Sequence, residues 1–343
     1  MNKNLDLLRA FAVLLVTVGH LLAFFDKLGP YFHMRFVTLG RLGVLLFFVH
    51  TALVLMGSLE REPGAASFLI RRIFRVYPLA MFAIGVVILF HLPQATIGAH
   101  YFQGYKPDFG DIIANLSLTQ NFSYRIALLG PTWTLSYEMQ MYLFLPLLFS
   151  IACTRNRAFA VYFFVLAICL PIQHYSTTGN LAFWAPCFFP GILAYQLMKG
   201  NPRKLPAYCW FIFLILICSL YTAAPYSSYN DYVLCLALGL GIPRFAELQL
   251  PAITRACHSI AKYSYGIYLT HFTAIYLAFD RWGYLPRPLQ VAIFVVILTA
   301  VPVLLYHTIE APMIGLGKKI GATKTSIPHG ASLSLAQSPS PLD

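Results

Sequence analysis

The sequence predicts an all-α fold, a polytopic membrane bundle of about ten transmembrane helices. Hydrophobic residues make up 59% of the 343 residues, charged residues only 10%, and the mean hydropathy is +0.68. Soluble domains are roughly a quarter charged. Apolar stretches of about 20 residues, the length that crosses the hydrocarbon core, recur along the whole chain. This composition excludes an ordinary soluble protein and predicts one bundle rather than several globular domains.

Ten apolar stretches are candidates for membrane spans. They are approximately 7–25, 41–59, 74–92, 133–152, 157–174, 181–198, 208–224, 229–246, 264–281 and 289–309. The eighth is the weakest, because Gly239, Gly241 and Pro243 interrupt it. We expect residues 1–322 to form one transmembrane domain. The Ser/Pro-rich, charge-poor segment 323–343 is expected to be a disordered cytoplasmic tail.

The distribution of basic residues predicts the orientation of the bundle. The formal net charge is +12. With an even number of spans and both termini in the cytoplasm, 17 of the 24 Lys and Arg residues lie at inner ends and seven at outer ends. This asymmetry follows the positive-inside rule and predicts an N-in, C-in topology. The basic charge is therefore topogenic, and nucleic acid is not expected as a partner.

The rest of the chain offers little competing chemistry. The seven cysteines show no metal-ligand spacing and mostly occupy apolar stretches, so we expect buried thiols and no metal site. The sequence contains no Walker loop, HExxH, GxSxG or dinucleotide fingerprint. Glycine and proline punctuate the longest loop, 93–132, in which residues 111–122 are a candidate short helix at the membrane interface.

The first apolar stretch, 5–25, carries two groups that a helix serving only as an anchor does not need. Arg9 lies near its start and His20 near its end. At about 1.5 Å rise per residue, the two side chains are roughly 16 Å apart along the helix axis. An ionisable residue inside a span is a functional hypothesis by default, because its desolvation is costly. The alternative is a snorkelling arginine and an interior histidine that is only hydrogen-bonded.

Glu138 is the carboxylate of the fourth candidate span, 133–152. In the predicted topology this span runs inward and the first runs outward, so Glu138 and His20 lie at a similar depth near the outer face. A buried carboxylate and an imidazole at one depth can share a hydrogen bond, which offsets the burial of both and prepares the histidine to act as a base. The alternative is that Glu138 pairs with Arg9 or Arg41 and joins two helices.

Arg72 and Arg75 stand at the predicted cytoplasmic start of the third span. Residues three apart share one face of a helix. Two guanidinium groups on one face suit bidentate binding of a phosphate or pyrophosphate. The alternative is ordinary positive-inside anchoring.

Other polar side chains within the spans are candidates for contacts with substrate. Four polar residues of the ninth span are expected to line an interior cavity, or else to form hydrogen bonds within the bundle, worth about 0.6 kcal/mol each: Ser264, Tyr265, Tyr268 and His271. We assign no role to His50 of the second span. The candidates for substrate binding are Trp133, Ser136, Tyr268 and His271.

Six short segments together carry a family pattern. They are LDLLRAFAVLLVTVGH from Leu5, GRLGVLLFFV from Gly40, RRIFRVYP from Arg71, TWTLSYEMQMYLFLPLL from Thr132, YSYGIYLTH from Tyr263 and IEAP from Ile309. In this order they resemble the integral-membrane acyltransferase family three, bacterial enzymes that O-acylate, commonly O-acetylate, surface and secreted glycans. The resemblance extends from Leu5 to about Lys319, nearly the whole chain.

The resemblance implies a ten-span bundle that uses cytoplasmic acyl-CoA as donor, with no permanently bound cofactor. It implies that His20 is catalytic and that Arg9, in the family's Arg-x10-His arrangement, supports it. It also implies that Arg72 and Arg75 serve the donor, and that Glu138 occupies the family's acidic position.

The sequence departs from the family pattern at two places. Residues 50–53 read His-Thr-Ala-Leu where the family usually has Leu-Ser-Gly-Phe, so a tight glycine approach between helices is absent or altered there. Thr134 replaces the serine of the Trp-Ser element and keeps the hydroxyl. No hydrolase-like domain fused to the bundle is apparent in the sequence.

The expected function is therefore O-acylation, most simply O-acetylation, of a glycan hydroxyl by a multi-pass protein of the bacterial inner membrane. Its expected partners are acyl-CoA, a polysaccharide or lipid-linked oligosaccharide, and membrane lipid; a homodimer is left open. The sequence does not choose between direct transfer and an acyl-enzyme. The rival function is a transporter or flippase for a lipid-linked glycan, which would use the same buried polar groups as a pathway.

Overall fold

The computed structural model describes residues 3–26, 30–62, 64–92, 94–95, 101–102, 106–153, 157–175, 180–225 and 227–325. The all-α prediction is confirmed, since the described residues form helices apart from loops and one antiparallel pair of two-residue strands. The α-helices are α1 (Lys3–Phe25), α2 (Pro30–Arg61), α3 (Ala65–Leu89), α4 (Phe109–Leu116), α5 (Thr132–Leu148), α6 (Ala158–Tyr175), α7 (Leu181–Lys199), α8 (Cys209–Ala223), α9 (Ser228–Gly241), α10 (Pro251–Ile275), α11 (Arg287–Leu305) and α12 (Ala311–Thr325). The strands are β1 (Gln94–Ala95) and β2 (Tyr101–Phe102).

All ten apolar stretches are largely helical, but their lengths differ. Among the described residues, five helical segments are long and apolar enough to cross a membrane: Lys3–Phe25, Met34–Arg61, Ala65–Leu89, Leu181–Lys199 and Arg287–Ala322. Ala158–His174 and Cys209–Ala223 are shorter apolar helices. The chain is therefore a helical membrane protein with several candidate spans.

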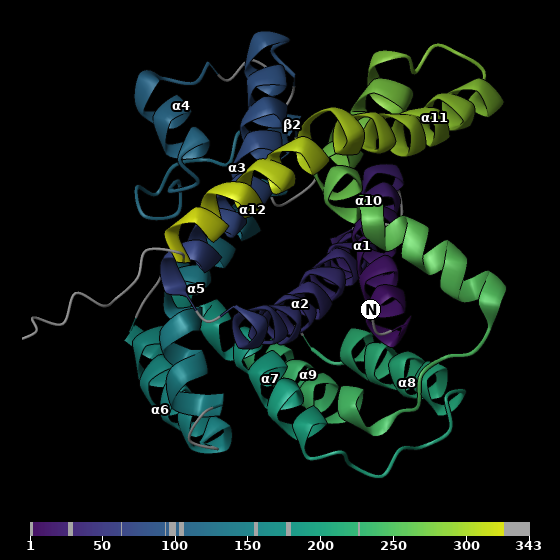
Figure 1. The fold of residues 1–343 in the computed structure, drawn as a ribbon. Helices are drawn as coiled ribbons and strands as arrows, with labels where there is room; N and C mark the ends of the chain where they lie inside the picture. Colours follow the sequence, from purple (N-terminus) through teal and green to yellow (C-terminus); the bar gives the residue numbers. More distant parts are fainter. Residues whose placement is uncertain are drawn as a thin grey trace, which may run out of the picture.

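Helices α1 and α2 form the centre of the bundle, and the other long helices surround them (Figure 1). α1 packs between α2 and α10, while α2 also packs against α5, α7 and α9. α3 lies on the other side of the centre, where it contacts α5, α10 and α12. Five helices thereby face one interior space: α1, α2, α3, α5 and α10.

Glycines allow α2 to approach its neighbours closely. A Cβ on Gly19 of α1 would lie 2.5 Å from the backbone nitrogen of Gly40, so the two backbones cross in contact. The glycine of the family pattern is absent from residues 50–53 of α2, but Gly191 of the neighbouring helix α7 lies against this segment. A Cβ on Gly191 would collide with the carbonyl of Val49 and lie 2.7 Å from the Cβ of Ala52. The tight approach is therefore altered rather than lost.

The C-terminal part of the chain is more continuous than expected. The last candidate span, 289–309, does not end the helix, because the π-helical turn Tyr306–Glu310 connects α11 directly to α12. This turn places irregular backbone hydrogen bonding directly before Pro312, which has no N–H to donate. α12 continues to Thr325, three residues into the segment expected to be disordered, and residues 326–343 of that tail lie outside the described residues.

The long loop contains a short helix, α4, which begins two residues before the predicted segment 111–122 and covers only its first half. α4 begins after Asp108, whose carboxylate accepts a hydrogen bond from the backbone N–H of Asp111 at 2.7 Å. The Asp111 carboxylate accepts in return from the N–H of Asp108 at 3.0 Å, which completes a capping box. The Arg125 guanidinium donates to both carboxylates, at 2.6 and 2.8 Å. These contacts fold the loop back on itself.

Candidate functional site

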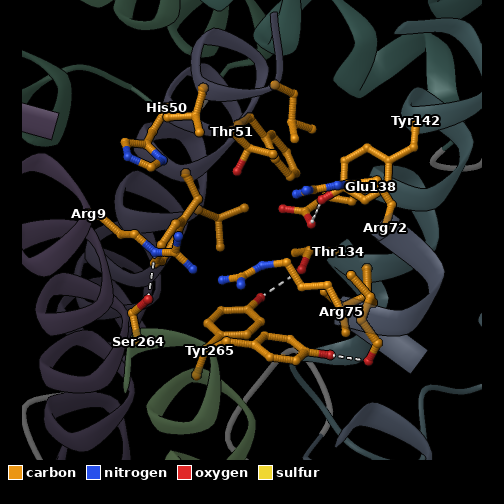
Figure 2. A pocket seen from close by; sticks show the side chains of 18 residues that line it. Arg9, His50, Thr51, Arg72, Arg75, Thr134, Glu138, Tyr142, Ser264 and Tyr265 are labelled. Atoms are coloured by element: carbon orange, nitrogen blue, oxygen red, sulfur yellow. Dashed lines mark hydrogen bonds between the residues drawn. The ribbon is translucent and has the colours of Figure 1, made fainter. Parts of the chain in front are cut away.

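An interior cavity of about 90 Å³ lies between α1, α2, α3, α5 and α10. Apolar side chains form much of its wall, chiefly from α2, but several polar side chains converge on it (Figure 2). The polar and aromatic lining residues with hydrogen-bonding groups are Arg9, His50, Thr51, Arg72, Arg75, Thr134, Glu138, Tyr142, Ser264, Tyr265 and Tyr268.

The cavity carries an excess of positive charge. Three arginines, Arg9, Arg72 and Arg75, line it against one lining carboxylate, Glu138, and Arg75 also pairs with the buried Glu310, which leaves one formal positive charge. Figure 2 shows the guanidinium groups of Arg9 and Arg75 reaching toward the middle from opposite sides, with Glu138 beside Arg72. Burying unbalanced charge is costly unless a partner of opposite charge is bound. The lining therefore favours an anionic ligand.

Arg9 reaches the cavity from the central helix α1. Its Nε donates a hydrogen bond to the hydroxyl of Ser264 on α10 at 2.6 Å. The Ser264 hydroxyl donates in turn to the carbonyl of Ala261 at 2.9 Å. Because Nε is used for this contact, the two terminal nitrogens of the guanidinium remain available to a ligand.

Arg72 and Arg75 lie on one face of α3, as their spacing predicted, and both line the cavity. Arg75 forms an ion pair of 3.5 Å with Glu310, whose side chain is 1% exposed. The Nε of Arg72 is buried without a hydrogen-bond partner among the described residues. Neither arginine is thus fully satisfied by the protein. The two residues share the cavity with Arg9 and Glu138, rather than standing apart at the inner face as expected.

Glu138 does not form the expected hydrogen bond with His20. Its carboxylate accepts a hydrogen bond of 2.9 Å from the Tyr142 hydroxyl, one turn along α5. Two residues at the same depth in the membrane lie close together only if their helices are neighbours. α1 packs against α2 and α10, whereas α5 packs against α2, α3 and α7, so Glu138 faces the arginines instead.

The alternative pairing of Glu138 with Arg41 is also wrong. Arg41 forms a buried ion pair with Asp231 of α9, and its Nε lies 3.1 and 3.2 Å from the two carboxylate oxygens. The Tyr221 hydroxyl donates to the same carboxylate at 2.7 Å. The Arg41 guanidinium also lies 4.6 Å from the centre of the Trp184 ring. Arg41 is therefore committed to joining α2, α8 and α9.

His20 pairs with a second histidine and does not line the cavity. Its Nδ1 lies 3.0 Å from Nε2 of His271 on α10. The Nδ1 of His271 lies 2.7 Å from the backbone carbonyl of Tyr268. His271 is completely buried, while His20 is partly exposed. The two histidines form a second polar site.

Tyr268 connects the cavity with this pair of histidines. Its side chain lines the cavity, and its hydroxyl lies 2.8 Å from the Thr134 hydroxyl and donates to the Pro131 carbonyl at 3.2 Å. Its own carbonyl accepts the hydrogen bond from His271. One residue of α10 therefore borders both polar sites.

Of the other polar and aromatic residues predicted from the sequence, some line the cavity and others are buried in the protein core. Ser264 and Tyr265 line the cavity with Tyr268, as expected. Trp133 instead packs against Trp184 and Tyr137, with ring centres 4.9 and 6.1 Å away. Ser136 is fully buried, and its hydroxyl has no partner among the described residues. Neither Trp133 nor Ser136 lines the cavity.

Three lining residues had no role in the sequence-based prediction. His50 is 5% exposed and lines the cavity beside Thr51, both from α2. Tyr142 lines it from α5 and binds Glu138. His50 had a signal, a titratable group inside an apolar stretch. Tyr142 had only its position four residues after Glu138, which places both on one face of a helix.

Comparison with known proteins gives a consistent assignment. The model of an acyltransferase domain family matches residues 2–307. A candidate acetyltransferase, ORF330 of Acidianus two-tailed virus, is 26% identical over 295 residues, covering 79% of this chain and 84% of that protein. Acyltransferase MdmB of Streptomyces mycarofaciens is 27% identical over 222 residues, covering 56% of this chain and 54% of that protein.

A third relative, nodulation protein 10 of Rhizobium leguminosarum bv. viciae, is 26% identical over 317 residues, covering 80% of this chain and 83% of that protein. No solved structure matches the chain.

Proposed function

The chain belongs to the membrane acyltransferase family three, an enzyme family, and from this premise we propose that it is an O-acyltransferase with cytoplasmic acyl-CoA as donor and a glycan hydroxyl as acceptor. An acetyl group is the simplest acyl group for it to transfer. The proposed setting is the bacterial inner membrane, with ten spans and both termini in the cytoplasm. Two of the relatives bear names of acetyl- or acyltransferases, which is consistent with this proposal.

The excess positive charge of the cavity is the observation that carries the donor assignment. Coenzyme A is a polyanion, and arginine binds phosphate through paired N–H groups. Arg72 and Arg75 would hold its phosphates, since neither is fully satisfied by the protein. The pantetheine arm would then run along the apolar face of α2. Glu138 limits the repulsion among the arginines while no donor is bound.

His20 is the proposed catalytic residue. Its imidazole removes the proton from the acceptor hydroxyl, and the oxygen forms a bond to the thioester carbonyl carbon. The C–S bond breaks, and the leaving thiolate takes the proton back from the imidazolium. In the alternative route, Nε2 of His20 attacks the thioester carbonyl carbon, the C–S bond breaks and CoA leaves as the thiolate. The acceptor oxygen then attacks the acyl-imidazole, the C–N bond breaks, and the hydroxyl proton passes to the thiolate.

Tyr268 borders the cavity with its side chain and contacts His271, the partner of His20, through its carbonyl. Tyr268 is therefore the proposed contact for the thioester end of the donor. Arg9 supports the reaction from the cavity side, where its free terminal nitrogens can bind the donor together with Arg72 and Arg75.

The deciding experiment measures transfer of radiolabel from [14C]acetyl-CoA to a glycan extract of the producing organism, in proteoliposomes. We expect His20→Ala to abolish transfer while abundance and size-exclusion behaviour stay as in the wild type. His174→Ala is the control, because His174 lies near the end of α6, away from both polar sites. Transfer at the wild-type rate by His20→Ala would refute the catalytic assignment. Absence of transfer in the wild type, with movement of a lipid-linked glycan across the bilayer, would favour the transporter.

A further inference from the structure

The hydrogen bonds around His271 determine which nitrogen of His20 carries a proton. A backbone carbonyl only accepts, so Nδ1 of His271, 2.7 Å from the Tyr268 carbonyl, has to be the donor. In a neutral imidazole the other nitrogen is then an acceptor. The Nε2 of His271 therefore accepts from Nδ1–H of His20, at 3.0 Å. This leaves Nε2 of His20 with its lone pair.

The surroundings keep both imidazoles in the neutral form on which this assignment depends. His271 is fully buried, and neither histidine forms an ion pair with a carboxylate among the described residues. The rings lie 5.1 Å apart, and Phe272 packs 4.5 Å from His20 and 4.6 Å from His271. Charging either ring in these apolar surroundings is unfavourable.

The structure also shows where the free nitrogen of His20 points. A Cβ on Gly40 would lie 3.2 Å from Nε2 and 3.3 Å from Cε1 of His20. The backbone of α2 can therefore run beside the ring without covering Nε2 with a side chain. His20 is partly exposed, and residue 40 places no side chain over Nε2.

We propose that His271 is a positioning residue: through Nδ1 of His20 it holds the catalytic imidazole in the tautomer whose Nε2 accepts the proton of the acceptor hydroxyl. This inference rests on the proposed function, and it replaces the substrate-binding role expected for His271. When Nε2 takes the proton, Nδ1–H remains bonded to His271, which stabilises the imidazolium. The acyl-histidine route has the same requirement, because it also uses the lone pair of Nε2.

The test measures kcat and KM of His271 variants with the [14C]acetyl-CoA assay. His271→Leu removes the acceptor for Nδ1–H, and we expect kcat to fall at least 100-fold while KM for acetyl-CoA changes less than twofold.

His271→Gln tests the tautomer rather than the packing. Its amide oxygen can accept from Nδ1–H of His20, so we expect at least a tenfold higher kcat than for His271→Leu. Thr270→Val is the matched control on the same helix, because its hydroxyl bonds only to the Gly266 carbonyl within α10. It should keep the wild-type kcat. Gly40→Ala should lower kcat without changing KM for acetyl-CoA, because its methyl group would stand over Nε2.

The outcomes separate this inference from the proposed function. If His20→Ala is inactive but His271→Leu keeps the wild-type kcat, the positioning role is wrong and the function stands. If His271→Leu and His271→Gln lose kcat equally although both elute as folded protein, the tautomer argument is wrong. If His271→Leu does not fold, His271→Gln and Gly40→Ala still test the proposal. A loss of kcat in His271→Gln together with the wild-type kcat in Gly40→Ala would contradict it. Full activity of His20→Ala refutes the function itself.

Discussion

The Nε of Arg9 donates a 2.6 Å hydrogen bond to the hydroxyl of Ser264, a residue 255 positions later in the chain. This contact joins α1 to α10 and turns the two terminal nitrogens of the guanidinium toward the cavity. Ser264 is the only hydrogen-bonding partner of Arg9 among the described residues. The geometry of one of the three cavity arginines therefore depends on a single hydroxyl.

Ser264→Ala should weaken donor binding. Without the hydroxyl, Arg9 loses a charge-assisted hydrogen bond, and KM for acetyl-CoA should rise about tenfold, which corresponds to about 1.4 kcal/mol. Steady-state kinetics at saturating acceptor measure this change. Ser259→Ala is the control, because Ser259 is exposed on the same helix. An unchanged KM in Ser264→Ala would show that Arg9 does not contact the donor.

Arg72→Ala and Arg75→Ala should each raise KM for acetyl-CoA more than KM for the acceptor. We expect at least a tenfold effect, because each arginine faces the cavity with unused donors. Arg75→Lys should raise KM for acetyl-CoA nearly as much as Arg75→Ala, since an ammonium group cannot bind a phosphate through a planar pair of N–H groups.

The control for this pair is Arg71→Gln. Arg71 lies on the same helix but bonds to Glu62 and Ser67 and does not line the cavity. Titration of purified protein with CoA gives an independent measurement. Equal losses of CoA affinity in Arg71→Gln, Arg72→Ala and Arg75→Ala would indicate a general effect of basic charge rather than a binding site.

Glu138→Gln should destabilise the ligand-free protein. It removes the one carboxylate among the described lining residues and leaves three guanidinium groups with only the Glu310 carboxylate, which pairs with Arg75. We expect the thermal midpoint to fall by about 5 °C, the order for a loss of 2–3 kcal/mol. Saturating CoA should recover most of this loss, because its phosphates replace the missing negative charge.

Thermal unfolding in detergent, with and without CoA, measures both effects. Glu60→Gln is the control: Glu60 pairs with Lys199 at the surface, where the two side chains are 46% and 48% exposed. Such exposed pairs contribute little to stability. A midpoint of Glu138→Gln that falls but does not respond to CoA would argue against anion binding in the cavity.

The loop around α4 should lose its folded form in acid. The hydrogen bond from Arg125 and that from the backbone of Asp111 hold the pKa of Asp108 below its ordinary value of 3.8. A carboxyl with a lowered pKa in the folded state stabilises that state above its unfolded pKa, and the contribution disappears as the pH falls through the folded pKa. Protection of the amides of residues 108–125 from exchange, relative to an unfolded chain at the same pH, should therefore be high at pH 7 and fall below about pH 4. Asp108→Asn should show the low protection already at pH 7, and high protection in that variant would contradict the prediction.

The sequence by itself determined the helices and the residues worth testing. Hydropathy is a local property, so each of the ten apolar stretches could be predicted as helical before any packing was known. The same holds for Arg72 and Arg75, because a spacing of three places both on one face of any helix. The polar groups of the interior were visible as exceptions within apolar stretches, and Arg9, Glu138, Ser264 and Tyr265 do line one cavity.

Only the tertiary structure decided which of these groups meet. A topology assigns each residue a depth in the membrane, but depth leaves open which helices are neighbours and which way each helix is rotated about its axis. His20 therefore bonds to His271 rather than to Glu138, because α1 packs against α10 and not against α5. For the same reason Trp133 and Ser136, three residues apart, both face away from the cavity that Thr134 and Glu138 line.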